Sequence, residues 1–326
     1  MATVVPPARE RVMAAERTVS VHKRQRGVAL ITVLVVIAIG TTLAAAMIWD
    51  SYLGKRRTAN IIDSDQATAY AIGAEEWAGE ILRRDREKND TDNLGEIWAT
   101  QLPPLPVDGG RIIGHIEDMQ GRFNLNNLIG KDGKPDKQAV AEFRRLLAVL
   151  NIDPTIIPAI EDWIDPDFNP QFPNGAEDDY YLGLQPAYRA ANRPMASITE
   201  LRLVKGIDDK IYRQLSPYVT ALPEAGTAIN VNTASAPVIA SLADGISEAD
   251  AESFISARGE AGFKSIGDFS EVFGRSVPDG LVTVSSHYFL VTEQVTIGTI
   301  TVTMYSLMSR ADNGSTRPVF RSLGTL

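Results

Sequence analysis

One uncharged stretch dominates the hydrophobic pattern near the start of the chain. From Val28 to Trp49, 22 residues pass without a charged side chain. At about 1.5 Å of rise per residue, a helix of this length spans about 33 Å, which matches the hydrocarbon core of a bilayer. A signal-peptide core is shorter, about 7–15 residues, and ends at a small-residue cleavage site. We therefore expect 28–49 to be a transmembrane helix that the mature protein keeps.

The helical pattern continues beyond this segment. Residues 51–87 contain no proline, and their apolar side chains recur at close to helical spacing. We expect these apolar residues to form the stripe that packs on the fold: Ile61, Ile62, Ala69, Ile72, Trp77, Ile81 and Leu82. The segment QLPPLPVDGG (101–110) then predicts a turn-rich break, and the alternation at Ile113, His115 and Glu117 predicts a strand.

Sequence typical of β-strands returns near the end of the chain. Residues 287–310 contain two β-rich runs separated by Gly298, which predicts a hairpin, and RPVFRSL (317–323) adds a last strand. Between the two β-rich regions, 137–274 are mostly helical in pattern. We predict an α+β fold in which strands from both ends form one small antiparallel sheet under the long helix, with a large all-α domain inserted between them.

Composition narrows the possible functions. The formal net charge of −9 argues against a protein that mainly binds phosphate backbones, because such binding depends on clustered Lys and Arg. The chain has no cysteine, which excludes a disulfide framework, a thiolate nucleophile and a Cys-ligated zinc. The three histidines, His22, His115 and His287, lie far apart in sequence, so we do not expect a His-rich metal site.

The segment 161–183, EDWIDPDFNPQFPNGAEDDYYLG, is densely acidic. Between Glu161 and Asp179 it has seven carboxylates and no Lys, Arg or His. Oxygen-rich clusters of this kind suit Ca²⁺, which takes about 6–8 oxygen ligands. The spacing is similar to that of an EF-hand loop, but Pro170 stands in place of the turn glycine and Glu177 comes one residue late. The loop is therefore not an EF-hand, although its ligand chemistry is similar.

Two other interpretations of the acidic loop stay open at this point. It can be a solvated surface loop, although its aromatic residues favour burial, which would bring the carboxylates together: Trp163, Ile164, Phe168, Tyr180 and Tyr181. Paired carboxylates also occur in glycoside hydrolases. Beyond generic aromatics, however, nothing nearby in the sequence supplies a sugar-binding platform.

Two segments resemble helix-hairpin-helix units. ITELRLVKGIDDKIYRQL (198–215) has the pattern of a helix, a Gly-containing turn and a helix, and 229–269 is similar to the repeat of competence DNA-binding proteins. Such hairpins bind DNA by bringing backbone N–H groups to a phosphate, with help from nearby cations. The second segment has six acidic residues against Arg258 and Lys264. We therefore expect it to be a compact helical packing unit that does not bind nucleic acid.

The start of the transmembrane segment resembles a prepilin processing site. In RGVALITVL, basic residues and Gly27 are followed at once by the apolar run. The resemblance to type IV prepilins and pseudopilins implies that prepilin peptidase cuts between Gly27 and Val28, and that the new N-terminus is methylated. That family usually has Glu as the fifth mature residue, where this chain has Thr32. A subunit with no neighbour above it would do better without a carboxylate in hydrocarbon.

The order of the motifs as a whole resembles a single family, the minor pseudopilin K of the type II (general) secretion pathway. The sequence combines the prepilin-like start, GRFNLNNL (121–128), the acidic loop with PAYRAANRPM (186–195), ITELRLVKGI (198–207) and NVNTAS (230–235). The resemblance covers Gly27 to about Leu307. It implies a leader at 1–27, a transmembrane helix at 28–49, a pilin-like helix and first strand at 50–124, an inserted α-domain with helix-hairpin-helix-like (SAM-like) units at 125–278, and C-terminal strands at 279–326.

The family also implies a cellular role. Expected partners are the minor pseudopilins I and J at the fibre tip, the major pseudopilin fibre and the prepilin peptidase. The expected location is a single pass of the inner membrane with the C-terminal bulk in the periplasm, and no catalytic step is expected. The family implies calcium in the periplasmic part, and the matching acidic motif assigns it to these residues: Asp165, Asp167, Glu177, Asp178 and Asp179.

Two alternative functions belong to other classes. A membrane-anchored DNA receptor of the competence type would bind DNA with a steep dependence on salt. A calcium-dependent surface hydrolase would place carboxylates of strongly raised pKa in an open cleft.

Overall fold

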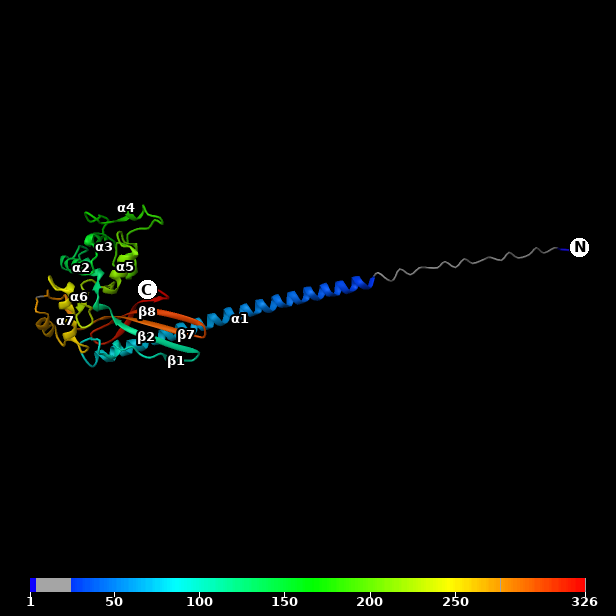
Figure 1. Ribbon diagram of the computed structural model, residues 1–326, viewed down its shortest axis with the longest axis horizontal. Coiled ribbons are helices and arrows are strands. Elements are labelled where there is room, and N and C mark those ends of the chain that lie inside the picture. Colours follow the sequence, from blue (N-terminus) through cyan, green and yellow to red (C-terminus); the bar gives the residue numbers. More distant parts are fainter. Residues whose placement is uncertain (4–24, 276, 326) are drawn as a thin grey trace. The chain divides into compact units, whose positions relative to one another are not determined.

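The computed structural model describes residues 1–3, 25–275 and 277–325 (Figure 1). The chain divides into two compact units, Met1–Ala59 and Asn60–Leu326. Most of the predicted leader, residues 4–24, lies outside the described residues.

In the first unit, helix α1 (Gln25–Arg86) presents apolar side chains on every face of its initial turns. It is the one helix of the described ranges that is long and apolar enough to cross a membrane. A helix that is hydrophobic all round and carries no protein cover suits lipid. The Thr32 hydroxyl donates to the carbonyl oxygens of Val28 and Ala29, at 3.2 and 2.9 Å, so it leaves no unsatisfied polar group in the apolar segment.

The second unit contains a five-stranded antiparallel sheet with the order β1-β2-β7-β8-β9. Its strands are β1 (Leu105–Val107), β2 (Gly110–Asp118), β7 (Tyr288–Ile297), β8 (Ile300–Arg310) and β9 (Thr316–Leu323). The predicted sheet and its β7–β8 hairpin are confirmed, and Gly298 adopts the positive φ (54°) that the tight turn needs. The predicted break at 101–110 is only partly right, because it contains β1, which pairs with β2 across a tight turn.

The Asn60–Arg86 part of α1 lies on this sheet through small residues. Ala67, Ala71, Ala78 and Leu82 are buried against the odd-numbered positions of β7, such as Val295. The predicted stripe was therefore wrong except at Ile81 and Leu82, because the larger residues Ile61, Ile62, Ile72 and Trp77 are exposed. The side chains of β7 and β8 already fill the space above the sheet. Alanine lets the helix backbone approach closely, whereas isoleucine would hold it away.

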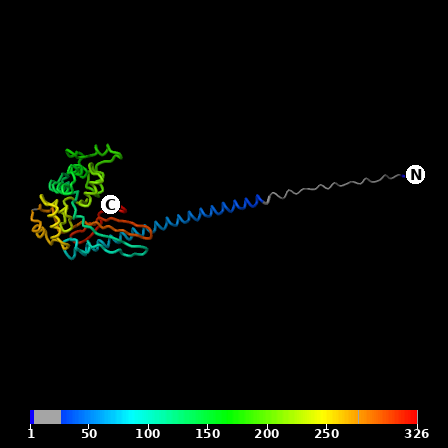
Figure 2. Tube along the Cα trace, viewed as in Figure 1, coloured from blue at the N-terminus to red at the C-terminus, as the bar shows by residue number. Residues whose placement is uncertain are grey.

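The helical block lies in the connection between β2 and β7, where the chain leaves the sheet and later returns to it (Figures 1 and 2). Its α-helices are α2 (Lys137–Val149), α3 (Ile157–Ile164), α4 (Asp178–Tyr181), α5 (Asp209–Leu215), α6 (Ala236–Ser241), α7 (Glu248–Arg258) and α8 (Ile266–Phe273). Among the residues that the structure describes, the 3₁₀ segments are Ile97–Ala99, Met119–Gly121, Leu125–Leu128, Pro154–Ile156, Ile198–Leu203 and Ser216–Tyr218. Two short parallel pairs join β3 (Phe123–Asn124) to β4 (Val219–Thr220) and β5 (Ile229–Asn230) to β6 (Val282–Thr283).

The two segments predicted as helix-hairpin-helix units differ in regularity. In the first, Ile198–Leu203 is a 3₁₀ helix and only α5 is an α-helix, with Gly206 at positive φ between them. In the second, α6 and α7 flank Gly245, which also has positive φ. The assignment of both segments to this motif class stays a prediction, as do the domain boundaries at 124/125 and 278/279.

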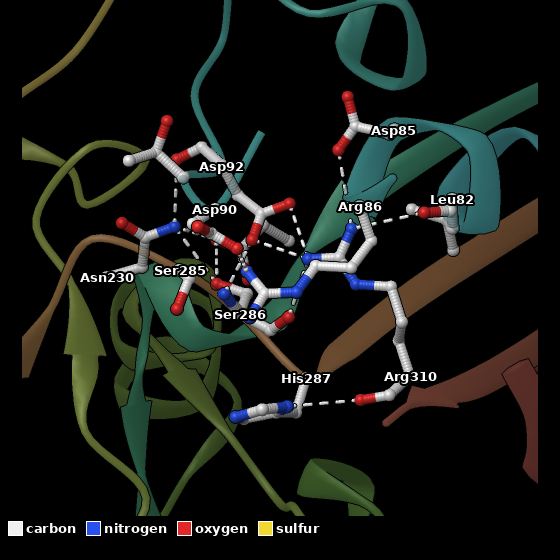
Figure 3. A network of polar contacts seen from close by, with 12 residues as sticks. Leu82, Asp85, Arg86, Asp90, Asp92, Asn230, Ser285, Ser286, His287 and Arg310 are labelled. Carbon is white, nitrogen blue, oxygen red and sulfur yellow. Dashed lines mark hydrogen bonds and ion pairs between the residues drawn. The ribbon is translucent and has the colours of Figure 1, made fainter. Parts of the chain in front are cut away.

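A buried cation ties the end of α1 to the sheet. Arg310 of β8 is almost fully buried, and its Nη2 donates to both carboxylate oxygens of Asp92, at 2.6 and 2.5 Å, and to the Ser286 carbonyl at 2.9 Å (Figure 3). Its Nη1 lies 3.3 Å from Asp85 Oδ2 and from the Leu82 carbonyl oxygen. The guanidinium therefore reaches the last turn of the helix, the loop that follows it and the segment just before β7.

The same network extends into the helical block. Asn230 Nδ2 donates to the Asp92 carbonyl at 3.1 Å and to Ser286 Oγ at 2.9 Å (Figure 3). Asn230 Nδ2, Ser286 Oγ and Thr233 Oγ1 also donate to Asp118 Oδ2, at 2.9, 2.7 and 2.6 Å, so three donors surround one carboxylate. These contacts fix the block at the Arg86 end of α1.

We predict that Arg310→Met destabilises the full chain in detergent micelles by about 3–5 kcal/mol in urea unfolding. Without the guanidinium, the buried Asp92 and Asp85 carboxylates would face each other unpaired. The matched control is Arg317→Met on the exposed side of β9, for which we expect a change within about 0.5 kcal/mol. Equal effects of the two substitutions would contradict the role given to Arg310.

Candidate metal centre

The acidic loop runs from the end of one helix to the start of another. Helix α3 ends at Ile164, and the N–H of its C-cap residue, Asp165, donates to the Glu161 carbonyl at 2.8 Å. The following residue, Pro166, disfavours the helical conformation at Asp165, which is extended. Glu177 then occupies the N-cap position of α4. Both ends of the loop are therefore anchored to helices packed on the core of the block.

Three carboxylates of the loop converge. Asp165, Asp167 and Glu177 each offer an oxygen, and these oxygens all lie within 4.8 Å of one another. Because Ca²⁺ binds oxygen at about 2.3–2.6 Å, a single ion can contact ligands this far apart. Asp165 and Glu177 are 1% and 4% exposed, whereas Asp167 is at the surface. The cluster therefore has two buried ligands and one on the solvent side.

The buried oxygens of the cluster lack partners. Asp165 Oδ1, both oxygens of Glu177 and Asn192 Oδ1 are buried without a hydrogen bond. Among the described residues, the ion pairs of this loop include Arg189 with Asp178 but none with the three clustered carboxylates. Burying carboxylates without a compensating charge is costly. A bound cation would supply that charge, so this set of oxygen donors fits Ca²⁺.

Two residues that the sequence analysis did not assign to the site shape it. Asp162 is fully buried and holds the loop in place, since it accepts hydrogen bonds from the N–H groups of Gln171 (3.0 Å) and Ala176 (2.6 Å). Asn192 has a positive φ of 45°, and its Nδ2 donates to the Asp167 carbonyl at 2.7 Å, which leaves its Oδ1 as a free acceptor. The position of Asp162 within the acidic run could have identified it from the sequence as part of the site. Asn192 lies too far along the chain for spacing to reveal it.

The other two predicted ligands lie outside the cluster. Asp178 is engaged by its neighbours, since it accepts hydrogen bonds from Arg189 Nη1 (2.7 Å) and from the Ala190 N–H (3.1 Å). Asp179 is exposed. The geometry thus brings together three of the five predicted ligands, and the assignment of Asp178 and Asp179 stays a prediction.

The pKa values of the clustered acids reflect their burial. Burial raises the pKa of Glu177 to about 7, and the charges of Asp162 and Asp165 add to the effect. Burial and the nearby Asp167 raise the pKa of Asp165 to about 6. The pKa of Glu161 is likewise raised to about 7 by burial and by Asp162. Each acid therefore ionises at a higher pH than usual, mainly because it is buried and secondly because its neighbours are acidic.

The aromatic residues of the loop divide into two groups. Trp163 and Tyr181 are buried and meet edge to face with ring centroids 5.3 Å apart, while Trp163 Nε1 donates to Glu200 at 3.0 Å. Phe168 and Tyr180, which we expected to be buried, are exposed. Of the loop aromatics, Trp163 in α3 and Tyr181 in α4 thus pack on the core, and they hold the two ends of the loop.

The predicted processing site lies at the start of α1. Gly27 and Val28 are both exposed, and a Cβ added at Gly27 would meet no other atom within 4 Å. Cleavage between them stays a prediction.

Comparisons with known proteins agree on one family. Family models described as Type II secretion system (T2SS), protein K, match residues 121–224 and 229–284. The Type II secretion system protein K of Pseudomonas aeruginosa is 41% identical over 318 residues, covering 93% of this chain and 94% of that protein. The protein of the same name from Aeromonas hydrophila is 34% identical over 289 residues, covering 82% of this chain and 87% of that protein.

A solved structure shares the fold. A chain of the GspK-GspI-GspJ complex from the enterotoxigenic Escherichia coli Type 2 Secretion System superposes with a TM-score of 0.74 at 27% sequence identity. The match covers 83% of this chain and all of that chain.

We predict that calcium chelation lowers the melting temperature of the full chain in detergent by about 5 °C or more. An ion present at about 100 times its Kd adds about 2.7 kcal/mol to the stability. Glu177→Gln should abolish this difference, because it removes a buried ligand. Asp179→Asn, which changes an exposed carboxylate outside the cluster, should preserve it. Identical melting curves with and without chelator would refute the calcium role.

We also predict that calcium binding weakens about tenfold or more between pH 7.5 and pH 5 in calorimetric titrations. In the ion-free fold the pKa values of Asp165 and Glu177, about 6 and 7, lie above those of the unfolded chain. Protons therefore compete with the ion below pH 7, and the ion-free fold loses stability as the pH rises through this window. An affinity independent of pH would show that these acids are not ligands.

Proposed function

The chain belongs to the protein K family of the type II secretion system, and from this membership we propose that it caps the tip of the periplasmic pseudopilus as a non-catalytic subunit. As a minor pseudopilin of type II secretion it acts in protein transport. Tip capping would place it at the leading end of the fibre that moves folded exoproteins toward the outer membrane.

The observation that carries this proposal is the place of the helical block. The network of Arg310, Asp92 and Asn230 fixes the block at the Arg86 end of α1. Pilin-like subunits assemble by packing their long helices side by side, so a bulky block at this end would obstruct a further subunit stacked above. Thr32 supports the same arrangement, because it brings no carboxylate to pair with the N-terminal amine of a subunit above.

We further propose that the partners are the minor pseudopilins I and J. The similar complex of known structure contains GspI and GspJ. Outside its contact with the sheet, α1 exposes Ile61, Ile62, Ile72 and Trp77, which neighbouring helices would cover. The major pseudopilin fibre and the prepilin peptidase complete the expected partners. Val28–Trp49 would hold the subunit in the inner membrane, with the C-terminal bulk in the periplasm.

Calcium would act as a structural staple in this role. Asp165, Asp167 and Glu177 would hold the ion, with Asn192 Oδ1 as a further oxygen. The ion would supply positive charge that keeps three carboxylates together in a chain without cysteine. Contacts within the protein also order the loop, because the hydrogen bonds to Asp162 and the Trp163–Tyr181 contact position its two ends.

The two alternative functions find less support. Arg258, one of two basic residues in the segment similar to DNA-binding repeats, is buried and donates to the carbonyl oxygens of Val231 and Ala234, at 2.9 and 2.7 Å. It is therefore not free to meet a phosphate. A hydrolase would need its acids open to a polymeric substrate, and Asp165 and Glu177 are buried.

Labelling of isolated pseudopili tests the capping role. We expect gold-labelled antibodies against this subunit to bind only at fibre ends in electron micrographs. Mass spectrometry of the subunit from the same fibres should show a methylated N-terminus at Val28, and Gly27→Leu should keep the leader attached. Label repeated along the shaft would overturn the proposal, and a subunit starting at Met1 would remove the processing step.

A further inference from the structure

A largely apolar cavity of about 220 Å³ opens beside the helix–sheet contact. Its walls come from α1, from the segment that follows it and from the sheet, and include Trp77, Ile97, Trp98, Leu105, Ile112 and Val291. Trp77, Ile97 and Leu105 are exposed, so large apolar side chains surround the entrance. Aromatic side chains around a pocket are typical of the sites where a partner protein anchors.

Glu293 of β7 lines this apolar cavity. It is 1% exposed, and neither of its carboxyl oxygens has a hydrogen-bond partner. The residue paired with it on β2 is Gly114, which offers no side chain. A buried acid with two unsatisfied oxygens is costly, so its position calls for an explanation outside the isolated subunit.

The cation of the fold that acts on Glu293, Arg321, is already engaged. Arg321 of β9 forms a two-pronged contact with Glu75 of α1, from Nε and Nη2 at 2.6 Å each. Ser306 Oγ also donates to Glu75, at 2.5 Å. His115 lines the cavity from β2, but its Nε2 lies 3.7 Å from Glu117. Glu75 is thus satisfied within the fold, and Glu293 is left without a counter-charge.

We propose that this cavity receives a lysine or arginine side chain from a partner subunit that packs on this face of α1. The aliphatic stem would lie along Trp77 and Trp98, and the charged head would meet the carboxylate of Glu293. Lys and Arg combine an apolar stem with a cationic end, which matches apolar walls that lead to a single acid. An apolar side chain would leave Glu293 unpaired, and an acidic one would be repelled.

This inference rests on the proposed assembly with the I and J subunits. A binding experiment tests the assembly and the role of the cavity separately. The full chain in detergent micelles is titrated with the purified I and J subunits of the same secretion system. We expect Glu293→Gln, which keeps the shape but cannot ionise, to weaken binding at least tenfold. Gln294→Leu is the matched control, because Gln294 is the next residue of β7 and is exposed, and it should bind as the wild type does.

Stability measurements distinguish this role from a purely structural one. Glu293→Leu replaces an unsatisfied buried acid with an apolar side chain, so the melting temperature of the free chain should stay equal or rise while binding falls. The proposal would be overturned if both Glu293 variants had a lower melting temperature than the wild type and bound the I and J subunits as tightly as the wild type does.

Proton release gives a second readout. Burial raises the pKa of Glu293 to about 8, and the Glu75 charge adds to this, with Arg321 acting in the opposite direction. At pH 7 the acid is therefore mostly protonated in the free chain, and pairing with a cation would expel the proton. The binding enthalpy of the wild type should then depend on the ionisation enthalpy of the buffer, and that of Glu293→Gln should depend on it less.

The outcomes are distinct. If the wild type binds the I and J subunits and both Glu293 variants bind equally well with the same buffer dependence, the cavity is not the anchor, although the partnership stands. If the wild type does not bind these subunits, the partnership and this inference fail together.

Discussion

The architecture depends on one buried charge interaction. Arg310 is the last residue of β8, and its side chain neutralises acids at the end of α1 and in the loop beyond it. Asp92 in turn accepts the N–H of Ser286 at 2.7 Å and offers its carbonyl to Asn230. Helix, sheet and helical block therefore share a single electrostatic centre, and each depends on the other two to keep its charged or polar groups satisfied.

Within the part of the chain that the structure describes, two clusters of carboxylates have the spacing of a metal site, and they differ in what balances their charge. Asp85, Asp92 and Glu96 form one, and Asp165, Asp167 and Glu177 form the other. The first is filled by the Arg310 guanidinium, and burial still raises the pKa of Asp85 to about 6. The second has no such internal cation among the described residues. The same local geometry thus holds an arginine of the chain itself in one place and forms a candidate site for a bound ion in the other.

The sequence predicted what depends on local patterns and missed what depends on distant contacts. The apolar run, the Gly298 hairpin and the convergence of Asp165, Asp167 and Glu177 follow from runs and spacings. The buried face of α1 did not, because large apolar residues of this helix are exposed and alanines are buried against a crowded sheet. Arg310 and Asp92 are separated by 218 positions, and Asn192 reaches the Asp167 carbonyl across 25 positions with its side-chain amide. Residue spacing therefore reveals neither contact.

The connectivity of the sheet sets the order in which the chain can reach its native state. Gly110 of β2 pairs with Ile297 of β7, and the whole helical block lies between them. Because β2 precedes β7 along the chain, it is synthesised long before the strand that pairs with it. The folded block has its own core and brings Asp118 and Ser286 together, which shortens the loop that must be closed. The inserted block thus also acts as a connector, because it reduces the conformational entropy lost when β7 pairs with β2.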